Sequence, residues 1–435
     1  MICESRFLTA LVLIPLCAQL MLTSNANAQD KKAGGDAAKA PALKVVVDAG
    51  DEDPSVKWKS LLARRLAIFE QLQDLKKKFA AAATNDEKRT IRVQYVDLIR
   101  EFDIQVYSDM LDLAATIYEK NEGDLDAGEI VMKEAFNNND FDRSAEVSAK
   151  LLAANRKTKD VLSMGAVSQF ALHNFEQASA IFAEAQKMNR LDLRYETYVE
   201  DAAKYQELWD AEQELRAKED ALEGDAALPR IQYETAKGNI VIELFEDHAP
   251  NTVANAISLV EGGKYDGIAF HRIEMGFMAQ GGDPNTLDDD PSNDGYGGPG
   301  YTIKWESDRE DARLHFRGSL SMAYPPELID AAGSQFFITH LPTDWLNART
   351  EPEKGGHTVF GRVIDGMKVA ASLRKGDKIT KATVLRKRPH EYKPEITPDE
   401  KPEEPDADSS KDDSTEDAPA KEKGESSKED DSKTE

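Results

Sequence analysis

Apolar residues recur every three or four positions between about residues 54 and 222, on a background rich in alanine, leucine, glutamate and lysine and almost free of proline and glycine. This spacing is typical of amphipathic α-helices. In segment 60–79 the apolar face consists of Leu62, Ile68, Phe69 and Leu72. In segment 86–118 it consists of Ile91, Tyr95, Ile99 and Phe102. We predict an antiparallel helical pair joined near Asn85 and Asp86.

A weak repeat of 34 residues follows this pair. Its two copies, NNDFDRSAEVSAKLL and LHNFEQASAIFAEAQ, align Phe141 with Phe175. The second copy matches a tetratricopeptide helix pair at its packing positions, which are Phe175, Ala178, Phe182 and Ala185. The first copy fits less well, because Ser144 and Ser148 occupy two of those positions. A degenerate tetratricopeptide-like hairpin and an ordinary helix bundle both agree with the pattern, and either would supply a partner-binding surface rather than chemistry.

The pattern changes at Arg230, where apolar and polar residues begin to alternate as they do in β-strands. Two such stretches have Lys237 and Gly238 between them as a hairpin turn. One helix is predicted from Pro250 to the glycine pair 262–263, and a shorter one over 365–376. The remaining apolar segments are short: GFMAQ, GSLSMA, SQFFITH, TVFGRVI and KATVLRK. Many short strands with two distant helices favour a closed antiparallel β architecture over a βαβ sheet.

Length and charge limit the function. A chain of 435 residues exceeds one compact core, so two or three units are expected. With 55 Lys and Arg against 81 Asp and Glu, the net charge is −26. This charge argues against nucleic acid and against anionic membrane surfaces as partners. Much of the excess lies in residues 394–435, which lack aromatic residues and which we interpret as a disordered acidic tail.

The N-terminus has the form of a secretory signal peptide. An apolar run over 7–22 is followed by Ala-Asn-Ala at 26–28, a small-residue cleavage site before Gln29. An uncleaved anchor is the alternative, but the run is shorter than the roughly 20 apolar residues of a membrane span. The two cysteines, Cys3 and Cys17, both lie in this segment, so the mature chain would carry no thiol. We therefore expect a secreted protein, periplasmic or extracellular, with no membrane span in its mature chain.

These patterns predict an all-α helical module followed by a β domain. The five predicted parts are a signal peptide at 1–28, a flexible linker at 29–50, the helical module at 51–225, the β domain at 228–393 and the acidic tail at 394–435.

The most specific signal is the stretch FHRIEMGFMAQGGDP at residues 270–284. It places a lone arginine, Arg272, before Phe277, Met278 and Gln280, and it contains no cysteine and no serine. These residue types do not form a nucleophile or a metal cage. They suit a reaction that needs a hydrogen-bond donor beside an apolar surface and no covalent intermediate.

Together with GGPGYTI, RGSLSMA, GSQFFITHLPTDWLN and HTVFGRVIDGM, this stretch resembles the cyclophilin family of peptidyl-prolyl cis-trans isomerases over about residues 231–388. The resemblance implies a closed antiparallel eight-stranded β-barrel capped by two helices, with the active groove on its outer surface. It also implies isomerase activity on proline-containing segments of client proteins, here exported ones, with no cofactor and no metal. A separate protein partner on the helical module is a further expectation.

The resemblance also assigns residues by position. Arg272 falls on the catalytic arginine. The proline pocket falls on Phe277, Met278, Phe337, Leu346 and His357. The peptide groove falls on Gln280, Ala323 and Gln335, and the tryptophan at its rim, associated with cyclosporin-type inhibitors, falls on Trp345. We expect catalytic roles for Arg272, Phe277, Gln280 and His357, and peptide binding by Met278, Ala323, Gln335, Phe337, Trp345 and Leu346.

The expected chemistry follows from the amide bond. Rotation about a peptide bond has a barrier of about 20 kcal/mol, because the nitrogen lone pair is shared with the carbonyl. Before proline the two isomers are close in energy, yet they exchange over about tens to hundreds of seconds. A guanidinium donor against the prolyl nitrogen would stabilise the twisted amide, in which that lone pair is localised.

Two features depart from the family pattern. Tyr324 stands where the family usually has asparagine, and the loops 285–296 and 347–356 are longer than usual. They leave an alternative open, in which a cyclophilin fold binds or chaperones proline-containing peptides without catalysis and the helical region is a partner-binding scaffold.

Overall fold

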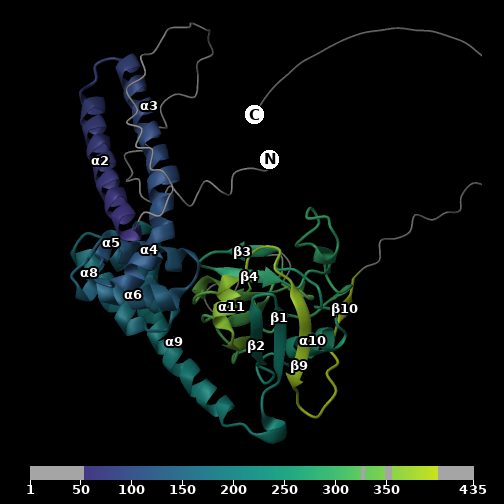
Figure 1. The fold of residues 1–435 in the computed structure, drawn as a ribbon. Helices are drawn as coiled ribbons and strands as arrows, with labels where there is room; N and C mark the ends of the chain where they lie inside the picture. The colour runs from purple at the N-terminus through teal and green to yellow at the C-terminus, as the bar shows by residue number, and fades with distance from the viewer. Residues whose placement is uncertain (1–52, 325–328, 348–354, 400–435) are drawn as a thin grey trace, which may run out of the picture. The chain divides into compact units, whose positions relative to one another are not determined.

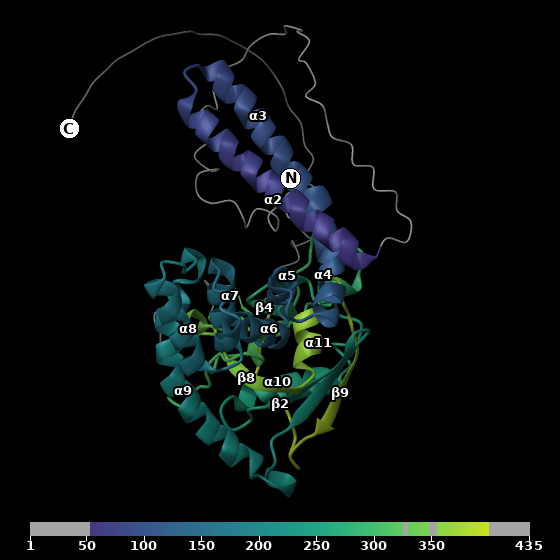
Figure 2. The ribbon, with the colours of Figure 1, turned by 60° about the vertical axis from the view of Figure 1, so that its left-hand side comes forward.

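A computed structural model describes residues 53–324, 329–347 and 355–399 of the chain. The predicted signal peptide, the linker and residues 400–435 of the predicted tail lie outside the described residues. Figures 1 and 2 show the fold from two sides. Among the described helices, none combines the length and the apolar character needed to cross a membrane.

The N-terminal part is helical, as predicted. Its α-helices are α2 (Pro54–Ala81), α3 (Asn85–Glu101), α4 (Ser108–Lys120), α5 (Leu125–Asn137), α6 (Phe141–Ala153), α7 (Lys159–Ala171), α8 (Phe175–Lys187) and α9 (Thr197–Asp220). A π-helical turn, η2 (Phe102–Tyr107), joins α3 to α4, and the short 3-10 helix η3 (Leu193–Tyr195) precedes α9.

Helices α2 and α3 form the expected pair and lie side by side in both views (Figures 1 and 2). Helix α3 begins at Asn85, because Thr84 and Glu87 form a capping box that satisfies its first backbone N–H groups. Ile68 and Leu72 are buried, as the pattern predicts. Phe69 is 37% exposed, since it lies about 100° around the helix from Ile68, although its ring still touches Phe102.

The 34-residue repeat is visible as two helix pairs in the same register. Helices α5 and α7 begin 34 residues apart, as do α6 and α8. Ser144 and Ser148, which fitted the repeat poorly, are both buried between α6 and α7. The Ser168 hydroxyl donates to Ser144 Oγ over 2.9 Å, and an added Cβ on Gly165 would lie 3.0 Å from the Ser148 Cβ. The helices approach closely there, so larger side chains would not fit.

The C-terminal part is a β domain, in whose described residues lie the α-helices α10 (Pro250–Glu261) and α11 (Met367–Ser372). Its strands are β1 (Arg230–Thr235), β2 (Gly238–Leu244), β3 (Arg272–Glu274), β4 (Met278–Gly281), β5 (Tyr301–Thr302), β6 (Ser319–Met322), β7 (Phe336–Thr339), β8 (Val359–Asp365), β9 (Ile379–Arg386) and β10 (Thr397–Pro398). Its 3-10 helices are η4 (Gly224–Ala226), η5 (Pro284–Leu287) and η6 (Asp344–Leu346).

Eight of these strands form one antiparallel sheet in the order β3-β4-β7-β6-β8-β2-β1-β9. The sheet is a curled half-barrel. No ladder joins its outer strands β3 and β9 in the part of the chain that the structure describes, and an isolated bridge pairs Ala269 with Lys378 nearby. The closed barrel expected from the sequence is therefore not confirmed. Alternate strand residues such as Ile242, Leu320 and Ile338 form the core, which also takes residues from α10 and α11.

The two parts share a buried interface. Phe316 and Leu341 of the β domain belong to the same apolar cluster as aromatic residues of α7, α8 and α9. The Phe316 ring lies 5.1 Å from that of Trp209 and 5.6 Å from that of Tyr205. The described residues up to Thr397 form one compact unit.

Candidate active site

The lone arginine of the most specific motif lies on the hairpin formed by β3 and β4. Its turn is Glu274-Met275-Gly276-Phe277, closed by a 3.1 Å hydrogen bond from the Phe277 N–H to the Glu274 carbonyl. Gly276 has a φ of +71°, the left-handed region that a type II turn needs at its third residue. Arg272 pairs with Gln280 across the hairpin, so the two side chains project from the same face.

This face continues onto the next strand. Gln280 pairs with Phe337 of β7, and the row Arg272, Gln280 and Phe337 therefore crosses three strands. The neighbouring row contains Ala279 and Ile338, which belong to the hydrophobic core. The two-residue period of the strands thus sends the core row inward and the arginine row outward.

A chain of side-chain hydrogen bonds runs from the arginine. Arg272 donates through Nε to Glu274 Oε1 over 2.9 Å and through Nη1 to Gln280 Oε1 over 3.3 Å, and its Nη2 also contacts Glu274. Gln280 donates to Gln335 over 3.0 Å. Gln335 in turn donates to the carbonyls of Gly295 and Gly297. The loop after the glycine pair is thereby tied to the arginine.

Apolar and aromatic side chains gather beside this chain. Phe337 is 5% exposed, and its ring meets that of His357 edge-on at 5.3 Å. The Phe277 ring lies 5.7 Å from Trp345, which is 49% exposed. The carbonyl of the half-buried Leu346 accepts from the His357 N–H over 3.1 Å. Met278, at the start of β4, is buried.

His357 is held in one orientation. Its Nδ1 lies 2.9 Å from the Met322 carbonyl, to which it donates, because a carbonyl only accepts. Burial lowers the pKa of His357, and the bond to Met322 opposes that shift. The Tyr324 ring lies 4.3 Å from the His357 ring, and its hydroxyl donates to the Gly356 carbonyl. The residue that departs from the family pattern thus covers one side of the histidine.

The one sequence-predicted residue not yet described, Ala323, lies at the same place. Ala323 follows β6, and its N–H donates to the carbonyl of Gln335 over 2.9 Å. All ten predicted site residues are described, and contacts or strand pairing connect them from Arg272 to His357.

His315 is a site residue that the sequence analysis missed. Its ring is fully buried and lies parallel to that of Phe337, with centroids 5.9 Å apart. Its Nδ1 donates to Asn347 Oδ1 over 2.7 Å, and Asn347 Oδ1 also accepts from the His315 backbone N–H. His315 supports Phe337 from behind. A lone histidine between apolar residues carries no sequence signal for this role.

Comparison with known proteins identifies the family to which the domain carrying this site belongs. A family model described as cyclophilin type peptidyl-prolyl cis-trans isomerase matches residues 230–392. A peptidyl-prolyl cis-trans isomerase of Synechococcus elongatus is 42% identical over 154 residues, which cover 35% of this chain and 93% of that protein. The chain belongs to the cyclophilin-type isomerase family. Like other members of this family, it is a peptidyl-prolyl cis-trans isomerase.

Two further matches are of similar extent. Peptidyl-prolyl cis-trans isomerase B of Bacillus subtilis is 44% identical over 138 residues, covering 32% of this chain and 85% of that protein. The crystal structure of a cyclophilin from Cryptosporidium parvum is 27% identical, with a TM-score of 0.31, and covers 37% of this chain and 98% of that chain.

Proposed function

We propose that this cyclophilin accelerates cis-trans isomerisation before proline in exported client proteins, with Arg272 stabilising the twisted prolyl amide. The observation that carries the proposal is the row of Arg272, Gln280 and Phe337, which places a guanidinium and a buried aromatic ring on one face of the sheet with Gln280 between them. An isomerisation breaks no bond, so a donor and an apolar wall are sufficient chemistry.

The arginine keeps donors for a substrate. A guanidinium has five N–H groups. Three contacts, two to Glu274 and one to Gln280, leave the other N–H groups without a hydrogen-bond partner among the described residues. In this proposal a free N–H points to the prolyl nitrogen in the twisted state, while Glu274 and Gln280 hold the plane of the guanidinium. A lysine could not be held in this way, because an ammonium lacks the planar fork.

The surrounding side chains take the roles that the family resemblance implies. Phe277, Met278, Phe337 and Leu346 would hold the pyrrolidine ring while the carbonyl side turns. His357 would close that site as a neutral ring. Gln335 and the Ala323 backbone would bind the peptide, and Trp345 would contact it at the rim, where a cyclosporin-type inhibitor would also bind.

The cellular role is proposed from the N-terminal sequence. Export through the signal at 1–28 would place the enzyme in the periplasm or outside the cell. X-Pro exchange limits folding for seconds to minutes there as elsewhere. The two helix pairs of α5 to α8, which we interpret as tetratricopeptide-like, would supply a surface for a partner protein.

The test is NMR exchange spectroscopy on a proline-containing peptide with the full chain and with Arg272→Ala. We expect the variant to lose about 2–4 kcal/mol of transition-state stabilisation, by analogy with the loss of one oxyanion donor, and to retain peptide affinity. Arg272→Lys should recover little of the rate. If Arg272→Ala isomerises at the wild-type rate, the role of Arg272 is wrong. A wild-type chain that binds peptide without speeding exchange would favour the binding-module alternative.

A further inference from the structure

We propose that Asn139, in the helical part of the chain, is a positioning residue of the isomerase site. It lies in the turn between α5 and α6, far in sequence from every residue of the site. Its carboxamide holds the turn of the β3–β4 hairpin, which carries Arg272 and Phe277. The inference deepens the proposed function and rests on it.

The helical repeat explains why this turn faces the β domain. Helices α5 to α8 each span 13 residues, and short turns make neighbours antiparallel, so alternate turns lie at the same end. The turns at Asn139 and His173 share one end, and both contact the β domain. Asn155, at the other end, is exposed. Asn139, His173 and Asn155 all have positive φ, near +60°.

Asn139 makes two contacts that fix its orientation. It is fully buried, and its Oδ1 accepts from the Gly276 N–H over 2.6 Å. Because a backbone N–H only donates, the amide nitrogen must be the atom 2.9 Å from His340 Nδ1. Nδ1 of a neutral His340 accepts that bond. One carboxamide therefore connects the hairpin turn to the residue that follows β7.

Both ends of this connection belong to the site. Gly276 precedes Phe277 and is the left-handed residue of the hairpin turn. The Phe277 carbonyl accepts from the His340 N–H over 2.8 Å, and β7 carries Phe337. The Asn139 carboxamide thus fixes the spacing between the strand pair that bears Arg272 and the strand that bears the proline-facing aromatic ring. A shift of about 1 Å in such a spacing can cost a large part of the rate.

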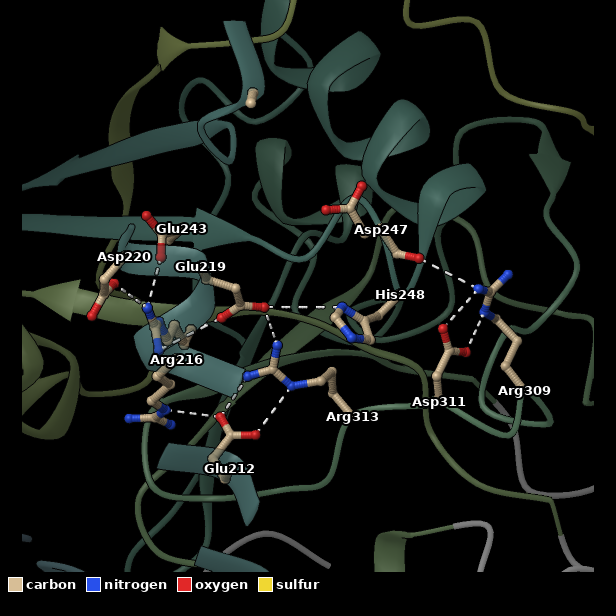
Figure 3. Close-up of polar contacts among 12 residues, drawn as sticks. Glu212, Arg216, Glu219, Asp220, Glu243, Asp247, His248, Arg309, Asp311 and Arg313 are labelled. Carbon is tan, nitrogen blue, oxygen red and sulfur yellow. Dashed lines mark hydrogen bonds and ion pairs between the residues drawn. The ribbon is translucent and has the colours of Figure 1, made fainter. Parts of the chain in front are cut away.

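The helical part is anchored firmly enough to act as a reference. Arg313 of the β domain is 1% exposed at its side chain and lies between Glu212 and Glu219 of α9 (Figure 3). Its bonds to Glu212 measure 2.6 and 3.1 Å. Glu212 also accepts from Arg216 over 2.8 Å, which places a second guanidinium at this junction.

Three more contacts lie close to the site itself. Arg374 donates to Asn138 over 2.7 Å, and Arg317 donates to Asp142 over 3.0 Å, on either side of Asn139. Tyr205 of α9 donates to the carbonyl of His315, the residue behind Phe337, over 3.1 Å. The helical part therefore supports both the hairpin turn and His315, the residue behind the Phe337 ring.

The experiment compares Asn139→Gly with Asn155→Gly in the full chain. Glycine adopts positive φ without strain, so each change removes a side chain and leaves the turn intact. By exchange spectroscopy we expect Asn139→Gly to lower the catalysed rate at saturating peptide on the order of tenfold. Peptide affinity should stay within about twofold, because the altered spacing matters most in the transition state. The Gly276 amide resonance should move, and Asn155→Gly should change none of these.

A conservative variant and a measurement on the unaltered chain complete the test. Asn139→Asp keeps an acceptor for Gly276 but loses the donor to His340, so it should recover only part of the rate lost in Asn139→Gly. Gly276 should also be protected from amide hydrogen exchange in the wild type. Equal rates in the two glycine variants, or a Gly276 amide that exchanges freely in the wild type, would overturn the proposal. These outcomes differ from failure of the proposed function, in which the wild type itself does not speed exchange.

Discussion

At the scale of single residues, the site is built around histidines that burial keeps neutral. Burial lowers the pKa of His315 to about 3, although its bond to Asn347 opposes the shift. Burial also lowers the pKa of His340 to about 4, with Arg317 adding to the effect. Both rings are buried, so a proton on either would place an uncompensated charge in the interior.

This burial predicts loss of stability in acid. The unfolded histidine pKa is about 6.5, so between about pH 6.5 and pH 4 the unfolded chain binds protons that the folded chain does not. The free energy of unfolding should therefore fall as pH drops through this range, by up to about 1.4 kcal/mol per pH unit for each histidine. Above pH 7 the two histidines do not make the free energy of unfolding depend on pH.

Urea unfolding between pH 7.5 and pH 4.5 measures the effect. The control is His390→Gln, since His390 is exposed and its pKa is raised by hydrogen bonds to Glu391 and Glu246 rather than lowered. The control should keep the acid-dependent loss, and His340→Gln should flatten part of it. An unfolding midpoint that stays constant from pH 7.5 to 4.5 would contradict the prediction.

The sequence pointed to those residues of the candidate site that a contiguous motif carries, and their roles stay predictions. Arg272, Phe277 and Gln280 stand within nine residues, and the resemblance placed Phe337 in a second such motif. Asn139 could not be found in this way, because its partner Gly276 is 137 residues away and its own surroundings read as an ordinary helix turn. A buried polar contact between distant segments produces no periodic pattern in the sequence.

At the scale of elements, α9 shows how a charged helix can form an interface. It has 24 residues, and Glu212 and Glu219 lie seven positions apart, hence on one face. The sequence analysis did not single out these glutamates. In the structure both contact Arg313, and Arg362 joins the network through Glu219, whose carboxylate lies 3.9 Å from it. The sequence predicts helix boundaries from caps and periodicity. It does not predict which other element will cover a given face of the helix.

Breaking this network should destabilise the chain. Glu212→Ala would leave Arg313 with Glu219 alone, so we expect a loss of about 3 kcal/mol, at the lower end of the range for breaking buried pairs. Glu214→Ala, an exposed position on the same helix, should cost less than about 0.5 kcal/mol.

Tryptophan fluorescence during urea unfolding is a suitable measurement, because the Trp209 ring lies 4.6 Å from the guanidinium of Arg216 in this network. Equal unfolding midpoints for the Glu212 and Glu214 variants would show that the network contributes little. A loss larger than the range for one buried pair would show that the whole network is lost with Glu212.

At the scale of the whole molecule, the sequence indicated a helical part and a β part but not their interface. The change of periodicity near Arg230 marks the boundary, and β1 begins there. Several of the contacts between the parts join segments more than one hundred residues apart, as in the pair Tyr205 and His315. No local pattern encodes which end of a helical repeat will meet which face of a sheet.

The proposed export of the chain predicts a defined mature N-terminus. Cleavage after Ala28 would leave Gln29 as the first residue. N-terminal sequencing of protein purified from its native host checks this directly. Recovery of a membrane-bound product that retains residues 7–22 would contradict both the cleavage site and the proposed compartment.

The shared cluster around Phe316 has a consequence for the order in which the chain folds. Within the helical part, the contacts among α5 to α8 join helices that are close in the sequence, so this part can fold while the rest of the chain is still being synthesised. The sheet must wait, because Ile231 of β1 pairs with Val384 of β9, 153 residues later. When Phe316 emerges, the aromatic surface of α7 to α9 is already complete and can receive it. The β domain, which folds later, would thus assemble against the aromatic surface of the helical part, which folds first.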